Sequence, residues 1–399
     1  MSQPLTTAPQ APAAAIPQTG ARLSQIVLIS AAVAFYWASL YFYVPTLSIY
    51  VQDKTNDLTT VGVVVSMYGL WQAIVRLPLG IVTDWMGRRK PFLIAGFLLS
   101  ALGAWLMATA SGAPGLITGR AITGLAAATW VPLVVIFSSL FPPQDAVRAT
   151  ALLAMINSLS RVIATGMNGR LNEMGGYQLA FFVAIAVAGL AILVTLPVRE
   201  QRRPPKQPSL RSIGVLITRK DVLLPAALSA VAQYIAWAST FGFIPVLARN
   251  MGANGDVNSL LMSMFLLIGM GGNLLTSIIA RRLGNFRMFM ISFSLTCIGV
   301  VLAGLAGSLP IIFVAQAILG FASGMLYPLL MGMSIEKVAD SERATAMGLH
   351  QAVYAIGMFA GPWLSGLLAP SIGIQPMFIA TGVVCLVIGI SGGQFLRSK

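Results

Sequence analysis

The sequence predicts an all-α membrane protein whose twelve transmembrane helices form two pseudo-symmetric six-helix bundles. Two observations carry this prediction, the share of apolar residues and an internal repeat. Hydrophobic residues make up 57% of the 399 residues and charged residues only 9%, whereas soluble domains carry about 25% charged residues. Apolar segments of about 20 residues can cross a bilayer. They must be helices, because lipid offers no hydrogen-bond partners to an open backbone.

The repeat relates the two halves of the chain. Three segments of the first half recur about 196 positions later: Gly119–Gly124 as Ala315–Gly320, Val131–Leu133 as Tyr327–Leu329, and Arg148–Ala151 as Arg343–Ala346. Two related membrane halves are typical of secondary transporters, whose substrate site lies at the interface between the halves. The repeat therefore predicts a transporter before any motif is considered.

Twelve spans follow in order along the chain. We expect them at roughly 26–50, 59–83, 91–110, 115–138, 149–171, 178–197, 223–248, 258–280, 288–307, 311–334, 344–368 and 376–396. These spans divide the chain into an N-terminal bundle over 22–197 and a C-terminal bundle over 223–399. The Pro-rich segment 198–222 links them, and its part 209–220 has the composition of a short amphipathic helix on the membrane surface. Residues 1–21 have Pro, Ala and Gln but no basic start, which predicts a disordered cytoplasmic tail rather than a signal peptide.

The net charge of +14 would suggest a nucleic-acid partner in a soluble chain. Here the basic residues gather on one side of the predicted topology, in the loops that follow the even-numbered spans and in the linker. Only Lys54, Arg170 and Arg249 fall near the other side. Basic residues favour cytoplasmic loops, so we expect a multi-pass protein of the plasma membrane (the bacterial inner membrane), with both termini in the cytoplasm. The distribution of the charge therefore reflects topology and not a nucleic-acid partner. Cys297 and Cys385, both within spans, indicate neither a disulfide nor a metal site.

The loop between the second and third spans carries the most specific motif. It runs from Gly80 to Lys90, with Asp84, Gly87, Arg88 and Arg89 at fixed spacing. This segment resembles the signature loop of the major facilitator superfamily, and Arg120 followed by Gly124 in the fourth span is a second similarity. The resemblance covers residues 22–397 and implies a bacterial-type twelve-span secondary transporter that works by alternating access.

The resemblance also implies a gating role for Gly80, Asp84, Gly87, Arg88 and Arg89. In the family, the matching acidic and basic residues hold the cytoplasmic side shut by contacting the eleventh helix. Acidic residues near the start of that helix are the expected partners of Arg88 and Arg89, namely Glu336, Asp340 and Glu342. Trp85 departs from the family pattern, which has a basic residue there. The alternative is a basic loop that only sets topology.

Three arginines lie within spans of the N-terminal half, while every acidic residue falls in a loop or at a helix end. Arg161 lies deepest, and Asn157, Ala164 and Asn168 share its helix face. A buried arginine must face protein, water or an anion, so this polar face predicts an anion-binding site. Arg76 and Arg120 are further candidates. The alternatives are a snorkelling or gating role for Arg76, and helix contact and coupling for Arg120.

The resemblance implies that spans one, four, seven and ten line a central cavity. The polar and aromatic residues on these spans are therefore candidate cavity walls: Tyr36, Trp37, Tyr41 and Tyr43; Gln233, Trp237 and Thr240; Gln316, Ser323 and Tyr327. The alternative for the aromatic residues is packing or anchoring at the membrane interface. His350, the only histidine, is a candidate proton carrier, with a structural role as the alternative.

These observations predict a carrier of a small organic solute, anionic or polar, that requires no cofactor or metal. A multidrug, amphipathic-compound or lysolipid exporter of the same superfamily is the alternative within the class. A transport-inactive membrane receptor is the alternative from another class. An enzyme is excluded because no cluster of catalytic groups lies in the spans. We expect a monomer with a small-molecule substrate and the lipid bilayer as partners. The direction of transport and a coupling proton or other ion are left open.

Overall fold

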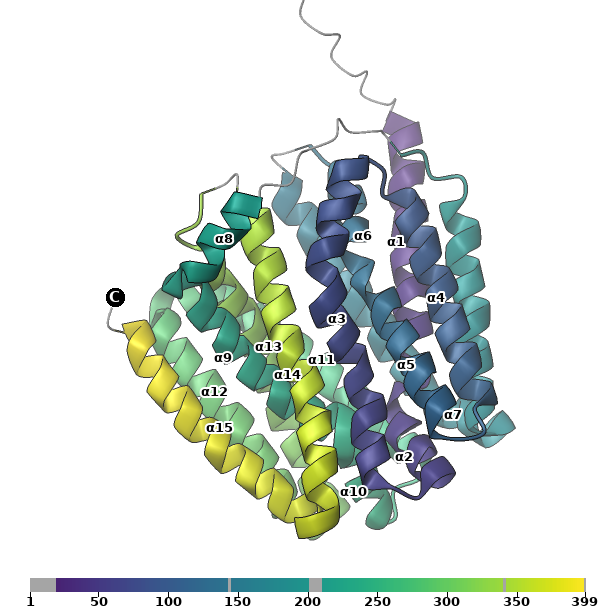
Figure 1. The fold of residues 1–399 in the computed structure, drawn as a ribbon, viewed down its shortest axis with the longest axis vertical. Coiled ribbons are helices and arrows are strands. Elements are labelled where there is room, and N and C mark those ends of the chain that lie inside the picture. The colour runs from purple at the N-terminus through teal and green to yellow at the C-terminus, as the bar shows by residue number, and fades with distance from the viewer. Residues whose placement is uncertain (1–18, 143–144, 201–209, 340–341, 398–399) are drawn as a thin grey trace, which may run out of the picture.

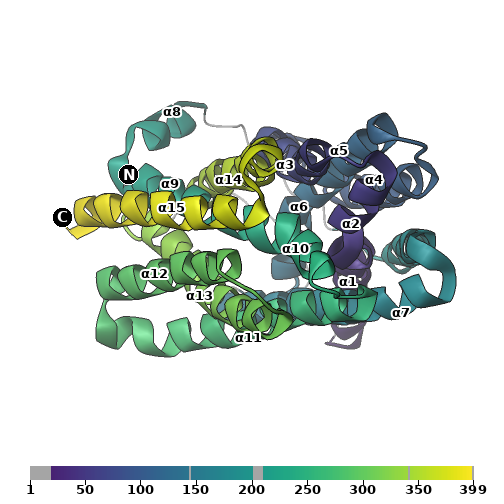
Figure 2. The same cartoon turned by 90° about the horizontal axis from the view of Figure 1, so that it is seen from below.

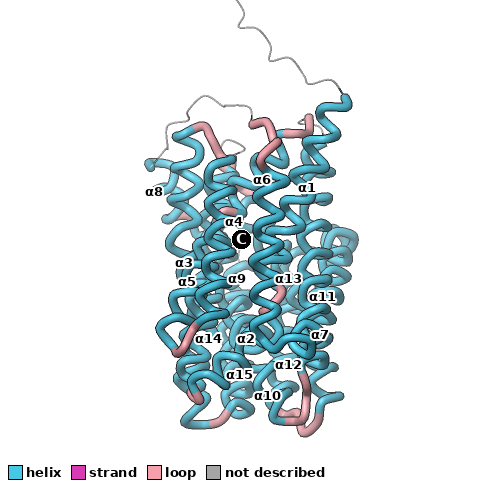
Figure 3. Tube along the Cα trace, turned by 90° about the vertical axis from the view of Figure 1, so that its right-hand side faces the viewer, coloured by secondary structure: helices cyan, strands magenta, loops and turns pink. Residues whose placement is uncertain are grey.

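The computed structural model describes residues 19–142, 145–200, 210–339 and 342–397 (Figure 1). All its regular elements in these residues are helices, and short loops join them at the two ends of the molecule (Figure 3). Most of the predicted tail, residues 201–209 of the linker and Asp340 lie outside the described residues.

The N-terminal half holds α1 (Thr19–Tyr41), α2 (Val44–Thr55), α3 (Leu58–Met86), α4 (Lys90–Thr109), α5 (Ala113–Ala128), α6 (Trp130–Ser139) and α7 (Ala146–Thr195). Helices α1 and α2 together form the first crossing, and α5 and α6 form the fourth. Each break precedes a proline, Pro45 or Pro132, which has no backbone N–H to continue the preceding helix. Prolines of this kind are tolerated in the first turn of the new helix.

Helix α7 contains two crossings. Its 50 residues are interrupted at Gly175 and Gly176, whose backbone is not helical. Gly176 has φ of 67°, in a region that glycine adopts without the penalty a side chain would add. The fifth and sixth predicted spans meet at this turn. Eleven helical stretches among the described residues are long and apolar enough to cross a membrane, and the turn in α7 makes twelve crossings.

The C-terminal half begins with α8 (Leu210–Thr218), a short helix within the predicted linker. The seventh crossing follows as α9 (Lys220–Ala238), the π-helical segment η2 (Ser239–Phe243) and α10 (Ile244–Asn250). The remaining crossings are α11 (Gly255–Leu283), α12 (Asn285–Gly304), α13 (Leu309–Ile335), α14 (Arg343–Ile372) and α15 (Ile374–Arg397). Pro245 opens α10 as Pro45 opens α2, so the first helix of each half is interrupted at the matching place in the repeat.

The two halves meet along two pairs of long helices. Figure 2 shows α3 beside α14 and α7 beside α11, with the other helices of each half packed behind them. We call the end where α8 lies the linker end, and the end where α2 and α10 lie the α10 end. Helices α3 and α14 lie closer together towards the α10 end than towards the linker end (Figure 1).

Glycine makes the close approach of α3 and α14 possible. A Cβ atom on Gly62 would lie 2.4 Å from the backbone oxygen of Pro362, and one on Gly69 would lie 2.5 Å from the backbone of Met358. Gly366 meets Gly62 in the same way, with 2.8 Å to its Cα. Small residues let membrane helices pack backbone to backbone. We call this contact of Gly62, Gly69 and Gly366 the glycine seam. It holds the α10 end of the two halves together.

Candidate functional site: a cationic central cavity

A cavity of about 280 Å³ lies between the two halves. Its walls come from both halves, with α1, α3, α6 and α7 on one side and α9, η2, α11, α13 and α14 on the other. Its lining residues include Arg76 and Arg161 but no Asp, Glu, Lys or His among the described residues. The cavity therefore carries two positive charges with no carboxylate to balance them.

Arg161 lies on the cavity wall formed by α7. Its guanidinium carbon is 4.3 Å from the centre of the Tyr41 ring and 5.6 Å from that of Trp37. A cation over an aromatic face is attracted by the ring quadrupole. The guanidinium makes no hydrogen bond or ion pair within the described part of the chain, and its Nε is buried without an acceptor. Asn157 lines the cavity one turn away, and its Oδ1 is also buried without a partner.

Arg76 lies on α3, whereas Arg161 lies on α7. Unlike Arg161, Arg76 has hydrogen-bond acceptors for its guanidinium. Its guanidinium donates to the Tyr354 hydroxyl of α14 and to Oε1 of Gln72, one turn earlier in α3. It also lies 5.3 Å from the centre of the Tyr354 ring. Since Tyr354 belongs to the other half, Arg76 forms a polar contact across the interface inside the cavity.

The C-terminal half lines the cavity with neutral polar groups. Four residues predicted from the sequence lie there, namely Gln233, Trp237, Ser323 and Tyr327. Asn273 of α11 and Gln351 of α14 also line it, although sequence reasoning missed both. The sequence could have indicated both residues, because an amide side chain within an apolar span is energetically unfavourable unless it faces protein or water.

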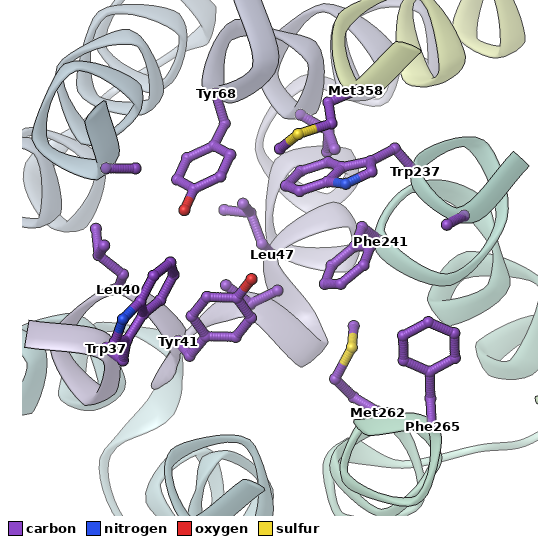
Figure 4. Close-up of a cluster of buried hydrophobic side chains, with 14 of the residues drawn as sticks. Trp37, Leu40, Tyr41, Leu47, Tyr68, Trp237, Phe241, Met262, Phe265 and Met358 are labelled. Atoms are coloured by element: carbon purple, nitrogen blue, oxygen red, sulfur yellow. The ribbon is translucent and has the colours of Figure 1, made fainter. Parts of the chain in front are cut away.

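Aromatic side chains form the part of the cavity nearest the α10 end. Figure 4 shows Trp37 and Tyr41 on one side, Trp237, Phe241 and Phe265 on the other, and Tyr68 near them. The Tyr68 and Trp237 rings stack at 5.2 Å with 18° between their planes, and Trp237 and Phe241 stack at 4.5 Å with 19°. The first of these stacks crosses the interface between the halves. A planar apolar body fits such a surface.

Five predicted cavity residues lie elsewhere, namely Arg120, Tyr36, Tyr43, Thr240 and Gln316. Arg120 is 1% exposed and sits behind Tyr68, 4.3 Å from its ring centre, with Nε and Nη1 lacking an acceptor among the described residues. Tyr36 is buried and donates from its hydroxyl to the Ala126 carbonyl at 2.8 Å. Gln316 is buried and accepts from Thr240 at 2.8 Å. Tyr43 stacks on Phe181 at 4.6 Å. All five contact their own half, because the helix faces that carry them pack inside the bundles.

Asn168, predicted on the same face as Arg161, lies beyond the cavity towards the α10 end. Its Oδ1 accepts from Thr46 at 3.0 Å and from Ser259 of the other half at 3.3 Å, while its Nδ2 donates to the Phe42 carbonyl at 2.7 Å. Asn168 therefore ties the break between α1 and α2 to α11.

His350 lies in the interior of the C-terminal half and does not line the cavity. Its Nδ1 is 2.7 Å from the Ser334 hydroxyl, which lies 3.1 Å from the Val222 carbonyl and can donate to it. When Ser334 donates to Val222, Nδ1 carries the ring proton, and Nε2 is buried without a partner among the described residues. His350 thus joins α9, α13 and α14, which is the structural role weighed from the sequence.

The signature loop closes on its own half in this structure. Arg89 bonds to Asp84 at 2.5 Å, and Glu200 accepts from the backbone N–H groups of Arg89 and Lys90 at 2.5 and 3.0 Å. Gly87 ends α3 with φ of 62°, a conformation that glycine favours. Gly80 is different, since a Cβ atom there would meet only ordinary contact with Val131 at 3.7 Å. Gly80 therefore makes no close backbone approach in this conformation.

The cavity opens towards the linker end. At the α10 end its residues Tyr41, Phe241 and Phe265 are buried, and Asp53 of α2 bonds to Arg249 of α10 at 2.5 Å. Ser48 of α2, fully buried, contacts the Phe241 carbonyl at 3.3 Å. Towards the linker end Asn273 is exposed and Tyr327 is 37% exposed. The structure is therefore closed at the α10 end and accessible from the linker end.

Comparison with known proteins places this cavity in context. The family model described as Major Facilitator Superfamily matches residues 29–231 and 226–397. The chain is 27% identical over 287 residues to a transcription regulatory protein of Pseudomonas aeruginosa, covering 70% of this chain and 71% of that protein. It is also 27% identical over 337 residues to the class H tetracycline resistance protein of Pasteurella multocida, covering 80% and 82%. A crystal structure of a POT family transporter, 14% identical, superposes with a TM-score of 0.77 over 94% of this chain and 96% of that one.

Proposed function

Because this chain belongs to the major facilitator superfamily and is a multi-pass secondary transporter, we propose that it carries a small organic anion through the central cavity by alternating access. One observation carries the proposal. Arg161 presents a guanidinium without an acceptor to a cavity whose lining contains no carboxylate among the described residues. An anionic group on the solute would supply that acceptor and balance the charge.

The proposed binding site combines a charged group with aromatic surfaces. Arg161 binds the anionic group, with Asn157 beside it as a hydrogen-bonding side chain, and Arg76 adds positive potential from the same half. Trp237 and Tyr41 contact the apolar body of the solute. Gln233 and Tyr327 are placed to bind its polar substituents. The volume of about 280 Å³ lies near the lower end of the roughly 300–1,000 Å³ of ligand pockets, which favours a metabolite-sized solute over a lysolipid.

The orientation in the membrane belongs to the same proposal. Basic side chains of the linker end include Arg88, Lys90, Lys220 and Lys337, and basic residues favour the cytoplasmic side. We therefore place the linker end and both termini in the cytoplasm of a bacterial cell. The cavity then faces the cytoplasm in this structure. It lies between two halves of one chain, so one chain forms a complete carrier, and the loop from Gly80 to Arg89 gates its inner side.

Export of a neutral aromatic compound is the second candidate function. The aromatic residues at the α10 end of the cavity favour it, and the similar protein of Pasteurella multocida is named for tetracycline resistance. Such a solute would bind to the stacked rings and make little use of Arg161.

Ligand-induced thermal stabilisation distinguishes the candidates. The purified protein is tested against aryl and alkyl sulfonates, carboxylates and phosphates, each paired with its neutral amide. A ligand at 100 times its Kd stabilises the folded state by about 2.7 kcal/mol. We expect anions to stabilise the wild type and to lose this effect in Arg161→Gln.

Arg170→Gln is the matched control, because Arg170 lies on the same helix, is exposed, does not line the cavity and pairs with Glu173 at 3.1 Å. It should leave every shift unchanged. Neutral aromatic compounds that stabilise wild type and Arg161→Gln equally, with no anion active, would support the second candidate instead. A transport-inactive receptor would show the thermal shift but no counterflow in sealed vesicles.

A further inference from the structure

We infer that this carrier exchanges one organic anion for another, because its empty central cavity changes sides far more slowly than its loaded one. The inference rests on the proposed function and assigns the mode of coupling to the same site. It follows from how Arg161 is held, what closure of the cavity does to it, and which groups could replace an anion.

Arg161 depends on water in the present conformation. Its contacts among the described residues are the faces of Tyr41 and Trp37, which accept no ordinary hydrogen bond. Arg76 differs, since Tyr354 and Gln72 both accept from it. The cavity is accessible from the linker end, so water can hydrate the guanidinium of Arg161 while that end is open.

Alternating access requires an intermediate in which both ends of the cavity are closed. Closing the linker end around a cavity of about 280 Å³ removes most of this water. A guanidinium that loses its water without gaining an acceptor is strongly destabilised. Asn157 could turn its amide oxygen to Arg161, but a neutral amide does not balance the charge. A bound anion does both, so the loaded cavity closes more easily than the empty one.

Proton coupling would need an acidic group or a histidine at the cavity, and none lines it within the described ranges. The described acidic residues lie in loops or near helix ends. His350 faces Ser334 and the Tyr354 ring inside the C-terminal half rather than the cavity. A solute anion is therefore the available counter-charge in both directions. A carrier that needs an anion to cross in each direction is an exchanger.

The first test uses the empty protein, so that it does not depend on knowing the substrate. The substitutions Cys297→Ala and Cys385→Ala first remove the native thiols. Ser48→Cys then introduces one thiol at the closed α10 end, where Ser48 is fully buried. The rate at which an impermeant maleimide labels this position reports how often the α10 end opens. With no solute present, Arg161→Gln should label at least about tenfold faster than the parent, because it removes the charge that opposes closure.

Two variants make this result specific to the charge. Arg161→Lys keeps the charge and should label as slowly as the parent. Lys54→Gln removes a positive charge that bonds to the Ala110 carbonyl within the N-terminal half, and it should also leave the rate unchanged. Equal labelling of Arg161→Gln and the parent would overturn the inference while leaving the proposed anion site intact. If no anion raised the thermal unfolding midpoint of the wild type, the proposed function itself would be contradicted.

The second test measures exchange directly. Proteoliposomes are loaded with radiolabelled benzenesulfonate, a permanently charged probe with one anionic group and one ring. External unlabelled benzenesulfonate should accelerate carrier-dependent efflux at least about tenfold over buffer alone, since the returning carrier is then loaded. Benzenesulfonamide, its neutral counterpart, should not accelerate it. Efflux into buffer as fast as efflux into benzenesulfonate would overturn the inference.

Discussion

Three arginines within the membrane differ in what compensates their charge. Arg76 donates to Tyr354 and Gln72, Arg120 lies behind the Tyr68 ring, and Arg161 faces the cavity against Tyr41 and Trp37. Of these, Arg120 does not line the cavity and Arg76 already has acceptors. This difference is why we propose ligand binding for Arg161, whereas Arg76 makes an interface contact and Arg120 packs inside its own half.

The Tyr41 ring should matter because it holds the Arg161 guanidinium in place. Removing the ring with Tyr41→Leu costs one cation–π contact, worth about 0.5–2 kcal/mol, and frees the arginine to take other rotamers. We expect anion binding to weaken by roughly 3- to 30-fold, measured as the concentration dependence of the thermal shift. Tyr41→Phe keeps the ring and should retain most of the affinity. A similar loss in both variants would show that the hydroxyl, not the ring, carries the effect.

The sequence identified the residues whose chemistry stands out in an apolar span and missed those whose role depends on packing. Arg161 and Asn157 were predictable because few polar groups occur mid-span, and both line the cavity. Neighbours in a helix point about 100° apart, but the sequence alone could not decide which of Tyr36 and Trp37 faces the cavity. Only packing shows that Trp37 lines the cavity while Tyr36 bonds to Ala126. The contact between Arg76 and Tyr354 joins two halves, so no local pattern could indicate it.

At the scale of helices, the interrupted crossings shape the cavity. The breaks before Pro45 in the first crossing and before Pro245 in the seventh lie at matching places in the repeat. Just before Pro245, the π-helical segment brings Phe241 into the cavity, and such segments are frequent at functional sites. The spans and the turn at Gly176 were predictable from hydropathy and glycine. The π-helical segment was not, because its register depends on tertiary packing.

The glycine seam between α3 and α14 leads to a prediction for Gly366. A Cβ atom there would lie 2.8 Å from the Cα of Gly62 and 3.1 Å from the backbone oxygen of Leu58. Backbone atoms cannot move aside as a side chain can, so Gly366→Val should force the helices apart. We expect a loss of about 1–3 kcal/mol in stability from overpacking, measured as a lower thermal unfolding midpoint.

Gly332 provides the control for the seam, because a Cβ atom there meets nothing within 4 Å. Gly332→Ala should be neutral or slightly stabilising, since alanine favours the helix by about 1 kcal/mol over glycine. An unchanged midpoint in Gly366→Val would mean that α3 and α14 are not tightly packed at this point in solution.

For the whole molecule, alternating access requires that the contacts at the α10 end break while the linker end closes. Besides the packing of α3 against α14, several polar side-chain contacts join the halves at the α10 end. Asp53 bonds to Arg249 at 2.5 Å, Ser259 to Asn168 at 3.3 Å, and Thr165 to Ser263 at 2.8 Å. Contacts of this kind can break and re-form, because water can replace each partner once the end opens. The Asp84–Arg89 pair at the linker end lies within one half, so its groups are available to contact the other half when that end closes.

The Asp53–Arg249 pair gives a prediction on this conformational balance. Both side chains are partly exposed, with 36% and 41% of their surface accessible, and pairs of this kind contribute about 0–1 kcal/mol. Asp53→Asn should therefore favour opening of the α10 end and raise labelling of Ser48→Cys by up to about fivefold. Arg249→Gln should have the same effect, and the double variant should add little to either, because both changes break one contact. Lys54→Gln removes a contact at the same end that lies within the N-terminal half, the bond to the Ala110 carbonyl at 3.0 Å, and should leave labelling unchanged. If the two single variants labelled at the parental rate, closure would depend on the glycine seam and the aromatic stacks, and the ion pair would be an incidental surface contact.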